Sequence, residues 1–212
     1  NPLRDIPPRP QHAFIPFVFA PQQVDLLLRA VCKKIRQNPK LFLKDLSLYM
    51  AIVLIARCGL RITEPLRLRL DHYRVREKTI YIAKTKFKKD RLLPVPIAVP
   101  AEIENYLETR KTWLPEVKNP YLLPGDQQKR LSDYRVRLVF HQAVKDIGLD
   151  QSKQSIGNTT FASPTPHSLR HSFAVNTLKL AKAKGKSPQS VLPVLAAYLG
   201  HSEYRHTIKY LK

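Results

Sequence analysis

Apolar residues recur at three- and four-residue intervals along most of the chain, and this spacing predicts a mainly helical protein. One predicted helix, 43–58, is apolar on nearly every side from Leu46 onward, which indicates the centre of a core. Gly59 and Gly148 follow two of the helices as stop signals. The predicted helices are 21–35, 43–58, 100–113, 133–147 and 166–184. Two more are predicted: one begins after 190 and has Pro193 in its first turn, and the other begins near 203.

Between 71 and 95 the period of the apolar pattern changes to two. Three short antiparallel strands are predicted there, at 72–76, 79–84 and 91–95. We therefore predict an α+β protein, mainly α with a small three-stranded antiparallel β-sheet.

The two remaining stretches show no regular pattern. Residues 150–164 are polar and predict a loop, whereas the first twenty residues are rich in proline and indicate an extended arm. The expected division is a linker at 1–19 and one folded domain at 20–212. The chain begins with Asn1 and not with Met, so we expect a fragment of a longer protein.

The charge of the chain is strongly positive. Lysine and arginine total 37 against 16 acidic residues, which gives a net charge of +21. Because 43% of the residues are hydrophobic, a folded domain with a basic face fits better than a disordered tail, and a polyanionic partner is expected. Cys32 and Cys58 lie in apolar helical patterns and are predicted to be buried free thiols of a reducing compartment. No apolar run is long enough to span a membrane.

The segment 165–174 concentrates side chains that could bind an anion or transfer a proton. His167, Arg170 and His171 are spaced to share one face of a helix that begins at Thr165 and Pro166. Imidazoles and a guanidinium at a helix N-terminus favour an anion, above all a phosphate. The two histidines also have the spacing of half a zinc site, but no third ligand stands at a suitable distance, so no metal is expected.

Two other basic positions are ambiguous on the residues alone. Arg61 lies in a tight connection between two core helices, where it is either a surface arginine paired with Glu64 or a group held for a purpose. The turn at 85–90 carries three lysines around one phenylalanine. It is either a solvated loop or a basic finger that reaches a DNA phosphate.

Taken together, these motifs resemble those of the tyrosine recombinase, or phage integrase, family. The stretch 59–64, GLRITE, resembles the family's GLRxxE motif, and Lys86 stands on the hairpin that follows, where the family has a lysine. HSLRHSFA at 167–174 matches the HxLRH box, LGH at 199–201 matches the LGH box, and Tyr210 follows at the position of the nucleophile. The order of the motifs makes the resemblance specific to the family's catalytic domain, over roughly 19–212.

The resemblance implies the following chemistry. Tyr210 attacks a DNA phosphate to give a 3′-phosphotyrosine, while Arg61 and Arg170 clamp the non-bridging oxygens. Lys86 protonates the leaving 5′-oxygen, and His167 assists proton removal from the tyrosine. These roles need no metal, cofactor or ATP. His201, the remaining member of the catalytic set, hydrogen-bonds the phosphate.

Other residues have supporting or alternative roles. Glu64 is expected to orient Arg61, and His171 to support the site. Four basic residues of the hairpin are candidates for DNA contact, and three of them also rival Lys86 as the acid. The candidates for DNA contact are Lys84, Lys88, Lys89 and Arg91. The rivals of Lys86 are Lys88, Lys89 and Arg91. Tyr198 and Tyr204 are rival nucleophiles, but their distance from the LGH box fits the family less well than that of Tyr210.

The resemblance also implies partners. We expect double-stranded DNA as the substrate, a homotetramer on synapsed DNA for the full-length protein, and an upstream core-binding domain joined through 1–19. A cytoplasmic location is expected, with nucleoid association in a bacterium. The connection at 182–189 is longer than in compact members, and only two residues follow Tyr210, where members commonly continue into a C-terminal helix. The alternatives are a telomere resolvase or type IB topoisomerase-like enzyme, and a non-catalytic DNA-binding relative.

Overall fold

The computed structural model describes residues 13–83, 90–113, 119–126, 129–201 and 207. Its helices are α1 (Pro21–Cys32), α2 (Pro39–Cys58), α3 (Val99–Trp113), α4 (Asp133–Asp146), α5 (Pro166–Ala183) and α6 (Pro188–Leu199), with short 3-10 turns at Pro65–Arg67 and Leu70–His72. Its strands are β1 (Ala13–Ile15), β2 (Tyr73–Arg74), β3 (Thr79–Ile82), β4 (Arg91–Pro94), β5 (Gln154–Ile156) and β6 (Thr159–Phe161). The mainly helical α+β class is confirmed.

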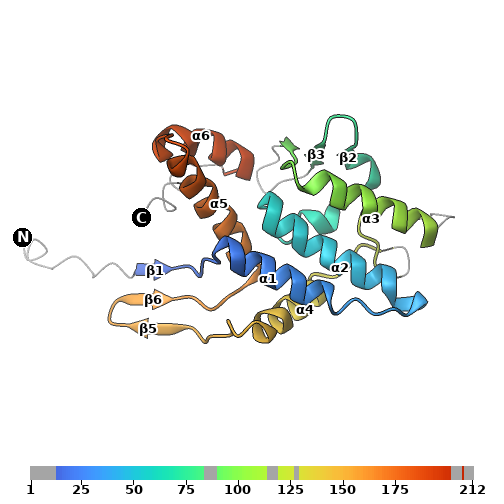
Figure 1. Ribbon diagram of the computed structural model, residues 1–212, viewed down its shortest axis with the longest axis horizontal. Coiled ribbons are helices and arrows are strands. Elements are labelled where there is room, and N and C mark those ends of the chain that lie inside the picture. Colours follow the sequence, from blue (N-terminus) through green and yellow to red (C-terminus); the bar gives the residue numbers. More distant parts are fainter. Residues whose placement is uncertain (1–12, 84–89, 114–118, 127–128, 202–206, 208–212) are drawn as a thin grey trace, which may run out of the picture.

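Helix α2 runs through the middle of the molecule, as its apolar sequence predicts (Figure 1). Helices α1, α3, α4 and α5 all pack against it, and residues from Met50 to Ile55 are almost completely buried. The helix begins at Pro39, earlier than predicted, because the Asn38 side chain accepts a hydrogen bond from the Lys40 N–H and proline suits the first position.

Gly59 ends α2 in the left-handed conformation, with φ +61°. A Cβ atom at this position would lie 2.5 Å from Cδ1 of Phe173 on α5. Both the backbone angle and the close approach therefore require glycine. The tight turn places Leu60 in the core and brings the next residue, Arg61, close enough to His167 at the start of α5 for the charge of Arg61 to act on the imidazole.

The predicted three-stranded antiparallel sheet is confirmed, in the order β2-β3-β4. Ile80 pairs with Tyr73 on one side and with Leu93 on the other, and all three side chains face the core. The hairpin between β3 and β4 carries residues 84–89, which lie outside the described residues. The predictions for Lys84, Lys86, Lys88 and Lys89 therefore have no structural counterpart here.

The prediction of a loop at 150–164 is wrong. The segment contains β5 and β6, joined through Gly157 at φ +56°, and β1 pairs with β6 in parallel. Each strand has only three residues, and β1 and β5 are exposed throughout, so burial imposes no alternating apolar pattern that the sequence could display. In Figure 1 this sheet extends away from the helical body.

Part of the predicted linker packs with the folded unit. Strand β1 belongs to the second sheet, and the side chain of Phe19 is fully buried against Phe140 of α4. The Phe19 N–H also donates to Ser172 Oγ at 2.7 Å, and Asn176 Nδ2 donates to the Phe19 carbonyl at 3.2 Å. The incoming chain is thus bound along α5. Residues 1–12 lie outside the described residues.

Two smaller predictions need correction. Helix α6 begins at Pro188, and Pro193 lies inside it and not in its first turn. Ser187 at the N-cap and proline at the first position place the start, since each suits that end of a helix. Both cysteines are free, but Cys32 is exposed because it lies at the end of α1; Cys58 is buried, and burial raises the pKa of its thiol to about 12.

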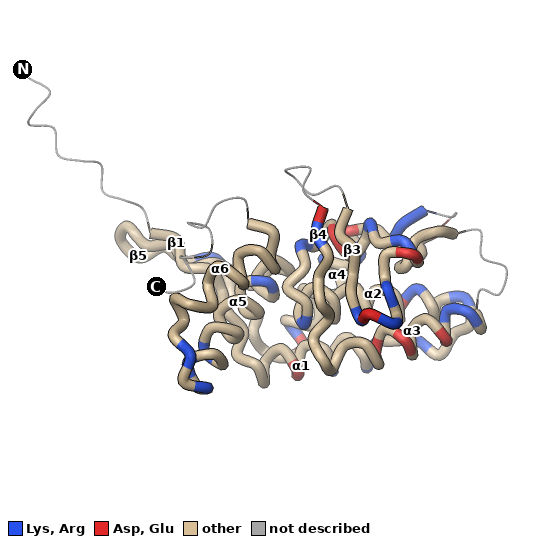
Figure 2. Tube along the Cα trace, turned by 90° about the horizontal axis from the view of Figure 1, so that it is seen from above, with Lys and Arg blue, Asp and Glu red and all other residues tan. Residues whose placement is uncertain are grey.

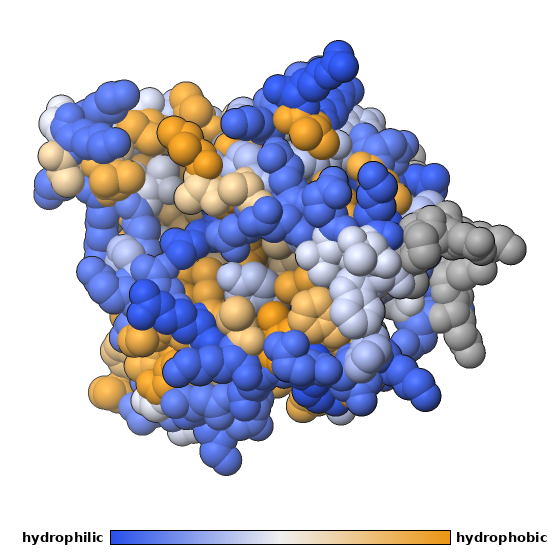
Figure 3. All heavy atoms as spheres, turned by 45° about the vertical axis from the view of Figure 1, so that its right-hand side comes forward, coloured by the Kyte–Doolittle hydropathy of each residue, from blue (hydrophilic) through white to orange (hydrophobic). Residues whose placement is uncertain are grey.

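Lysine and arginine residues are spread along both the helical body and the end of the α5–α6 pair (Figure 2). On the face in Figure 3, hydrophilic residues surround smaller patches of apolar ones. This distribution agrees with a folded domain that carries its positive charge on the surface. Across the ranges described above, no helix combines the length and the apolar character that crossing a membrane would need.

Candidate functional site

Arg61 lies in the turn after α2, where its own neighbours hold it. Its backbone N–H donates to Glu64 Oε2 at 2.8 Å, and its Nη1 donates to Glu64 Oε1 at 3.0 Å. Its Nη2 donates to the Gly200 carbonyl at 3.1 Å. The pairing with Glu64 is present, as predicted, but the contact with Gly200 joins the turn to the far end of the chain, so Arg61 is more than a surface ion pair.

Glu64 is the acidic centre of the site. Its side chain is 9% exposed and contacts Arg61 and Arg91, and its Oε2 lies 3.9 Å from Arg170 Nη1. Burial alone raises the pKa of this carboxyl. The hydrogen bond and charge of Arg91, the backbone of Arg61 and the charge of Arg170 outweigh burial, so the pKa falls below its ordinary 4.5. The carboxylate therefore stays ionised among three guanidinium groups.

Arg170 is almost completely buried, with its side chain 1% exposed. Its Nη1 donates to the Gly59 carbonyl at 2.8 Å, and its Nη2 donates to the Leu199 carbonyl at 2.6 Å. These carbonyls lie at the C-terminal ends of α2 and α6, where helix dipoles favour a cation. Arg170 thus joins three helices at one point.

The C-terminal end of α6 gathers the arginines. Three consecutive carbonyls, those of Tyr198, Leu199 and Gly200, accept hydrogen bonds from Arg91, Arg170 and Arg61 respectively. A helix leaves its last carbonyls without helical partners, so these bonds satisfy them.

Glycine is required at the end of this helix. Gly200 has φ +65°, and a Cβ there would lie 2.8 Å from Arg91 Nη1. The glycine of the LGH motif therefore keeps space for a guanidinium as well as providing the left-handed turn.

Arg91 is a candidate for DNA contact in the sequence, and the structure shows its guanidinium bound within the protein. Its Nη1 and Nη2 each donate to Glu64 at 3.1 Å, its Nε donates to the Tyr198 carbonyl, and only 11% of the side chain is exposed. Sequence reasoning missed this placement. A signal was available, because alternation along β4 puts Arg91 on the same face as the buried Leu93.

The two histidines of α5 lie where the spacing predicts. The rings of His167 and His171 meet edge to face with centroids 4.5 Å apart, one turn from each other at the helix N-terminus. The start of the helix is as predicted, with Thr165 extended before Pro166 and its N–H donating to Ser168 Oγ at 3.1 Å. His167 is exposed at the N-terminus of α5.

The surroundings of His167 favour its neutral form. Partial burial lowers the pKa of the imidazole below its ordinary 6.5, and the positive charges of Arg170 and Arg61 lower it further. A neutral imidazole at neutral pH can accept a proton, as a general base requires.

His201 follows the Gly200 turn at the same end of α6. Its Nδ1 lies 2.8 Å from Oγ1 of Thr207, a fully buried residue. No motif in the sequence connects these two residues. The contact engages one nitrogen of the ring and thereby orients the imidazole.

The described residues thus bring Arg61, Glu64, Arg170 and the Gly200–His201 turn together, with His167 beside them. Lys86, Tyr204 and Tyr210 lie outside the described residues, and their roles stay predictions. The remaining rival nucleophile, Tyr198, stacks its ring on Phe173, and its hydroxyl donates to the Pro94 carbonyl at 3.3 Å. Burial raises the pKa of that phenol, which disfavours the phenolate that would act as a nucleophile.

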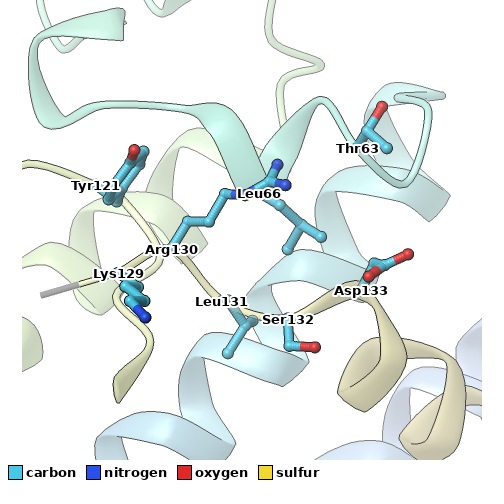
Figure 4. Close-up of a pocket in the computed structure, with 8 residues that line it drawn as sticks. All are labelled: Thr63, Leu66, Tyr121, Lys129, Arg130, Leu131, Ser132 and Asp133. Atoms are coloured by element: carbon cyan, nitrogen blue, oxygen red, sulfur yellow. The ribbon is translucent and has the colours of Figure 1, made fainter. Parts of the chain in front are cut away.

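A surface hollow of about 490 Å³ borders the turn that contains Arg61 (Figure 4). Thr63 lines it from that turn, and Lys129 and Arg130 line it from the segment before α4. Asp133 also lines it, so the hollow carries two basic groups and one acidic group. Over the described ranges, no group of three or more histidine, cysteine or acidic side chains is arranged to hold a metal ion.

Comparison with known proteins gives consistent matches. The model of the phage integrase family matches residues 18–212. A relative from Sinorhizobium fredii, named "Putative integrase/recombinase", is 34% identical over 83% of this chain and 54% of its own length. Tyrosine recombinase XerD of Caulobacter vibrioides is 31% identical over 91% of this chain and 56% of its own length. The chain thus spans about half the length of these two relatives.

Solved structures share the fold. A crystal structure of XerA recombinase superposes with a TM-score of 0.69 at 19% identity, over 93% of this chain and 61% of that one. XerH site-specific recombinase bound to its difH substrate in a pre-cleavage complex gives 0.68 at 21% identity, over 93% and 51%. The helical arrangement around α2 is therefore a fold that known recombinases use.

Proposed function

Because the chain belongs to the phage integrase family, we propose that it is the catalytic part of a site-specific DNA recombinase. It cleaves and rejoins DNA through a 3′-phosphotyrosine intermediate, without metal or ATP. The observation that carries the proposal is the placement of the family's two arginines, Arg61 and Arg170, around one ionised carboxylate. Such a preorganised cluster of guanidiniums suits the non-bridging oxygens of a phosphate in the transition state.

In this proposal the reaction conserves the bond energy of the DNA backbone. Tyr210 attacks the scissile phosphorus, and the phosphorus–5′-oxygen bond breaks, which leaves a phosphotyrosine and a 5′-hydroxyl. His167 accepts the proton of Tyr210, and Lys86 donates one to the departing oxygen. Arg61, Arg170 and His201 hold the phosphate oxygens. Reversal with a different 5′-hydroxyl completes strand exchange.

The partners proposed are double-stranded DNA and, for the full-length protein, three further copies in a tetramer on two synapsed sites. The high positive charge supports DNA binding, and so do related structures such as XerH, which is bound to DNA. Lys129 and Arg130, in the hollow next to the Arg61 turn, are candidates for backbone contacts. We place the protein inside the cell; nucleoid association stays a prediction.

The covalent intermediate gives the direct test. A nicked suicide substrate loses a short fragment after cleavage, so the enzyme cannot rejoin the strand and a protein–DNA adduct accumulates. We expect the full-length protein to form this adduct, detected by denaturing electrophoresis, and Tyr210→Phe to form none because the phenol oxygen is the nucleophile. The matched control is Tyr198→Phe, which removes the hydroxyl hydrogen bond to Pro94 and should leave the adduct in place.

The result also separates the alternatives. An adduct that persists in Tyr210→Phe would move the nucleophile to another residue. DNA binding without any adduct would favour the non-catalytic relative. Relaxation of supercoiled DNA that has no specific site would favour the topoisomerase-like enzyme. Against that alternative, the GLRITE, HSLRH and LGH motifs favour an integrase.

Protonation of His167 is expected to determine how the rate of adduct formation falls at acidic pH. Its pKa lies below 6.5, so the imidazole is neutral and able to accept a proton throughout neutral pH. We expect the rate of adduct formation to be independent of pH near 7 and to fall only below the ordinary imidazole range. His167→Gln should be slower by about 100-fold and should lose this limb. A limb centred above 6.5 would contradict the assignment.

A further inference from the structure

One guanidinium, that of Arg91, connects three elements of the site. It binds both oxygens of Glu64 from the first residue of β4, and its Nε binds the Tyr198 carbonyl near the end of α6. Glu64 in turn holds the backbone and the side chain of Arg61. The family's motifs quoted above do not include this arginine, and its burial excludes the simple explanation of a solvated surface charge.

We infer that Arg91 is a positioning residue for the phosphate clamp, an inference that rests on the proposed function. It acts on Arg61 through Glu64, and on the Gly200–His201 turn through the last turn of α6. It does not itself touch DNA. The strand, the Arg61 turn and the helix end are thereby fixed to one another by one planar group.

The arrangement also keeps donors of Arg61 available. Among the described residues, the Arg61 guanidinium uses Nη1 for Glu64 and Nη2 for Gly200, two of its five N–H donors. Because Arg91 binds the carboxylate through both of its terminal nitrogens, Glu64 has little freedom to form a bidentate pair with Arg61. Removing Arg91 would let the carboxylate turn fully onto Arg61 or toward Arg170, 3.9 Å away, and compete with the phosphate.

Only a planar fork makes these contacts together. A lysine at 91 would retain the charge but has one ammonium group, which cannot bind both carboxylate oxygens in plane and the Tyr198 carbonyl as well. Arg91→Lys therefore tests geometry, and Arg91→Gln tests geometry and charge together. Arg76→Gln is the matched control, because Arg76 is an exposed arginine of the same sheet region.

The experiment measures adduct formation by the full-length protein on two suicide substrates. One has the natural phosphodiester, and the other has a methylphosphonate at the scissile position, which lacks the charge of one non-bridging oxygen. We expect Arg91→Gln and Arg91→Lys to be slower by about 100-fold on the phosphodiester, as for a misplaced clamp. The loss should be at least tenfold smaller on the methylphosphonate, since the neutral group depends less on the clamp. Arg61→Gln should show the same pattern.

The outcomes separate this inference from its premise. Adduct formed by the unchanged protein but at an equal rate in Arg91→Gln would overturn the inference and leave the proposed function standing. An equal loss on both substrates would also overturn it, since the effect would then be on folding or on another step. No adduct from the unchanged protein would overturn the proposed function, and the inference with it.

A binding measurement distinguishes positioning from direct DNA contact. If Arg91 bound a phosphate, Arg91→Gln would reduce the slope of log affinity against log salt concentration by about one. We expect the slope to be unchanged, because the guanidinium is engaged within the protein. A reduced slope would overturn the inference in favour of a DNA contact.

Discussion

Replacing Arg170 by lysine is expected to damage both folding and catalysis. The buried guanidinium bridges the carbonyls at the ends of α2 and α6 in two directions. One ammonium group cannot reach both, so a carbonyl is left buried without its partner, and the fit at the junction of three helices is lost. We expect the free energy of unfolding to fall by about 3 kcal/mol, which for a domain of this size lowers Tm by roughly 10 °C.

The catalytic loss should be larger than the stability loss explains. Removing a preorganised donor from the charge that develops in the transition state costs on the order of 100-fold or more in rate. Adduct formation by Arg170→Lys should therefore be reduced by at least that factor at a temperature where the variant is fully folded. Calorimetry and the suicide substrate give the two measurements.

Arg57→Lys is the matched control for Arg170. Arg57 is on the surface of α2, one of the helices that Arg170 joins; its side chain is 39% exposed, and it pairs with Asp25 of α1. A lysine keeps such a pair, and the change in unfolding free energy should stay within about 0.5 kcal/mol. Arg170→Lys with the stability and rate of the unchanged protein would mean that the two carbonyl contacts do not contribute as described.

The sequence predicted those parts of the molecule that periodicity or a short motif determines. Helix α2 was evident because every side of it is apolar, and the start of α5 was evident because threonine and proline have strong positional preferences. The β5–β6 hairpin was missed because its three-residue strands are too short to show alternation. The alternation of apolar and polar residues that identifies a strand in a sequence arises because one face of the strand is buried.

The candidate site was predicted as a set of residues but not as a geometry. GLRITE, HSLRH and LGH identified Arg61, Arg170 and His201 by resemblance. Two of the contacts that join these motifs run between residues more than 100 positions apart, namely Arg170 with Gly59 and Arg61 with Gly200. No local pattern encodes such a contact. The bond of Arg91 with the Tyr198 carbonyl is of the same kind, and it changes a presumed surface cation into a buried one.

Glu64→Gln should be the other strongly affected variant, because one carboxylate offsets the charges of Arg61, Arg91 and Arg170. A neutral amide keeps one acceptor oxygen, and its NH2 group replaces the other, where it faces the N–H donors of Arg61 and Arg91. The negative charge is also gone, so the guanidiniums repel one another. Breaking a buried ion pair of this kind costs about 3 kcal/mol. Urea unfolding at pH 7 measures the loss, and Glu77→Gln is the control, since Glu77 makes an exposed pair with Arg74 worth less than about 1 kcal/mol.

The pH dependence identifies the carboxylate itself as the cause. The pKa of Glu64 is lower in the folded protein than its ordinary 4.5, so the folded state holds this proton less tightly than the unfolded state. The stabilisation is then fully present above 4.5 and is lost as the pH falls through the lowered folded value. The unfolding free energies of Glu64→Gln and the unchanged protein should differ most at neutral pH and converge in acid. A difference that stays constant down to pH 3 would show that Glu64 acts through its shape and not through its charge.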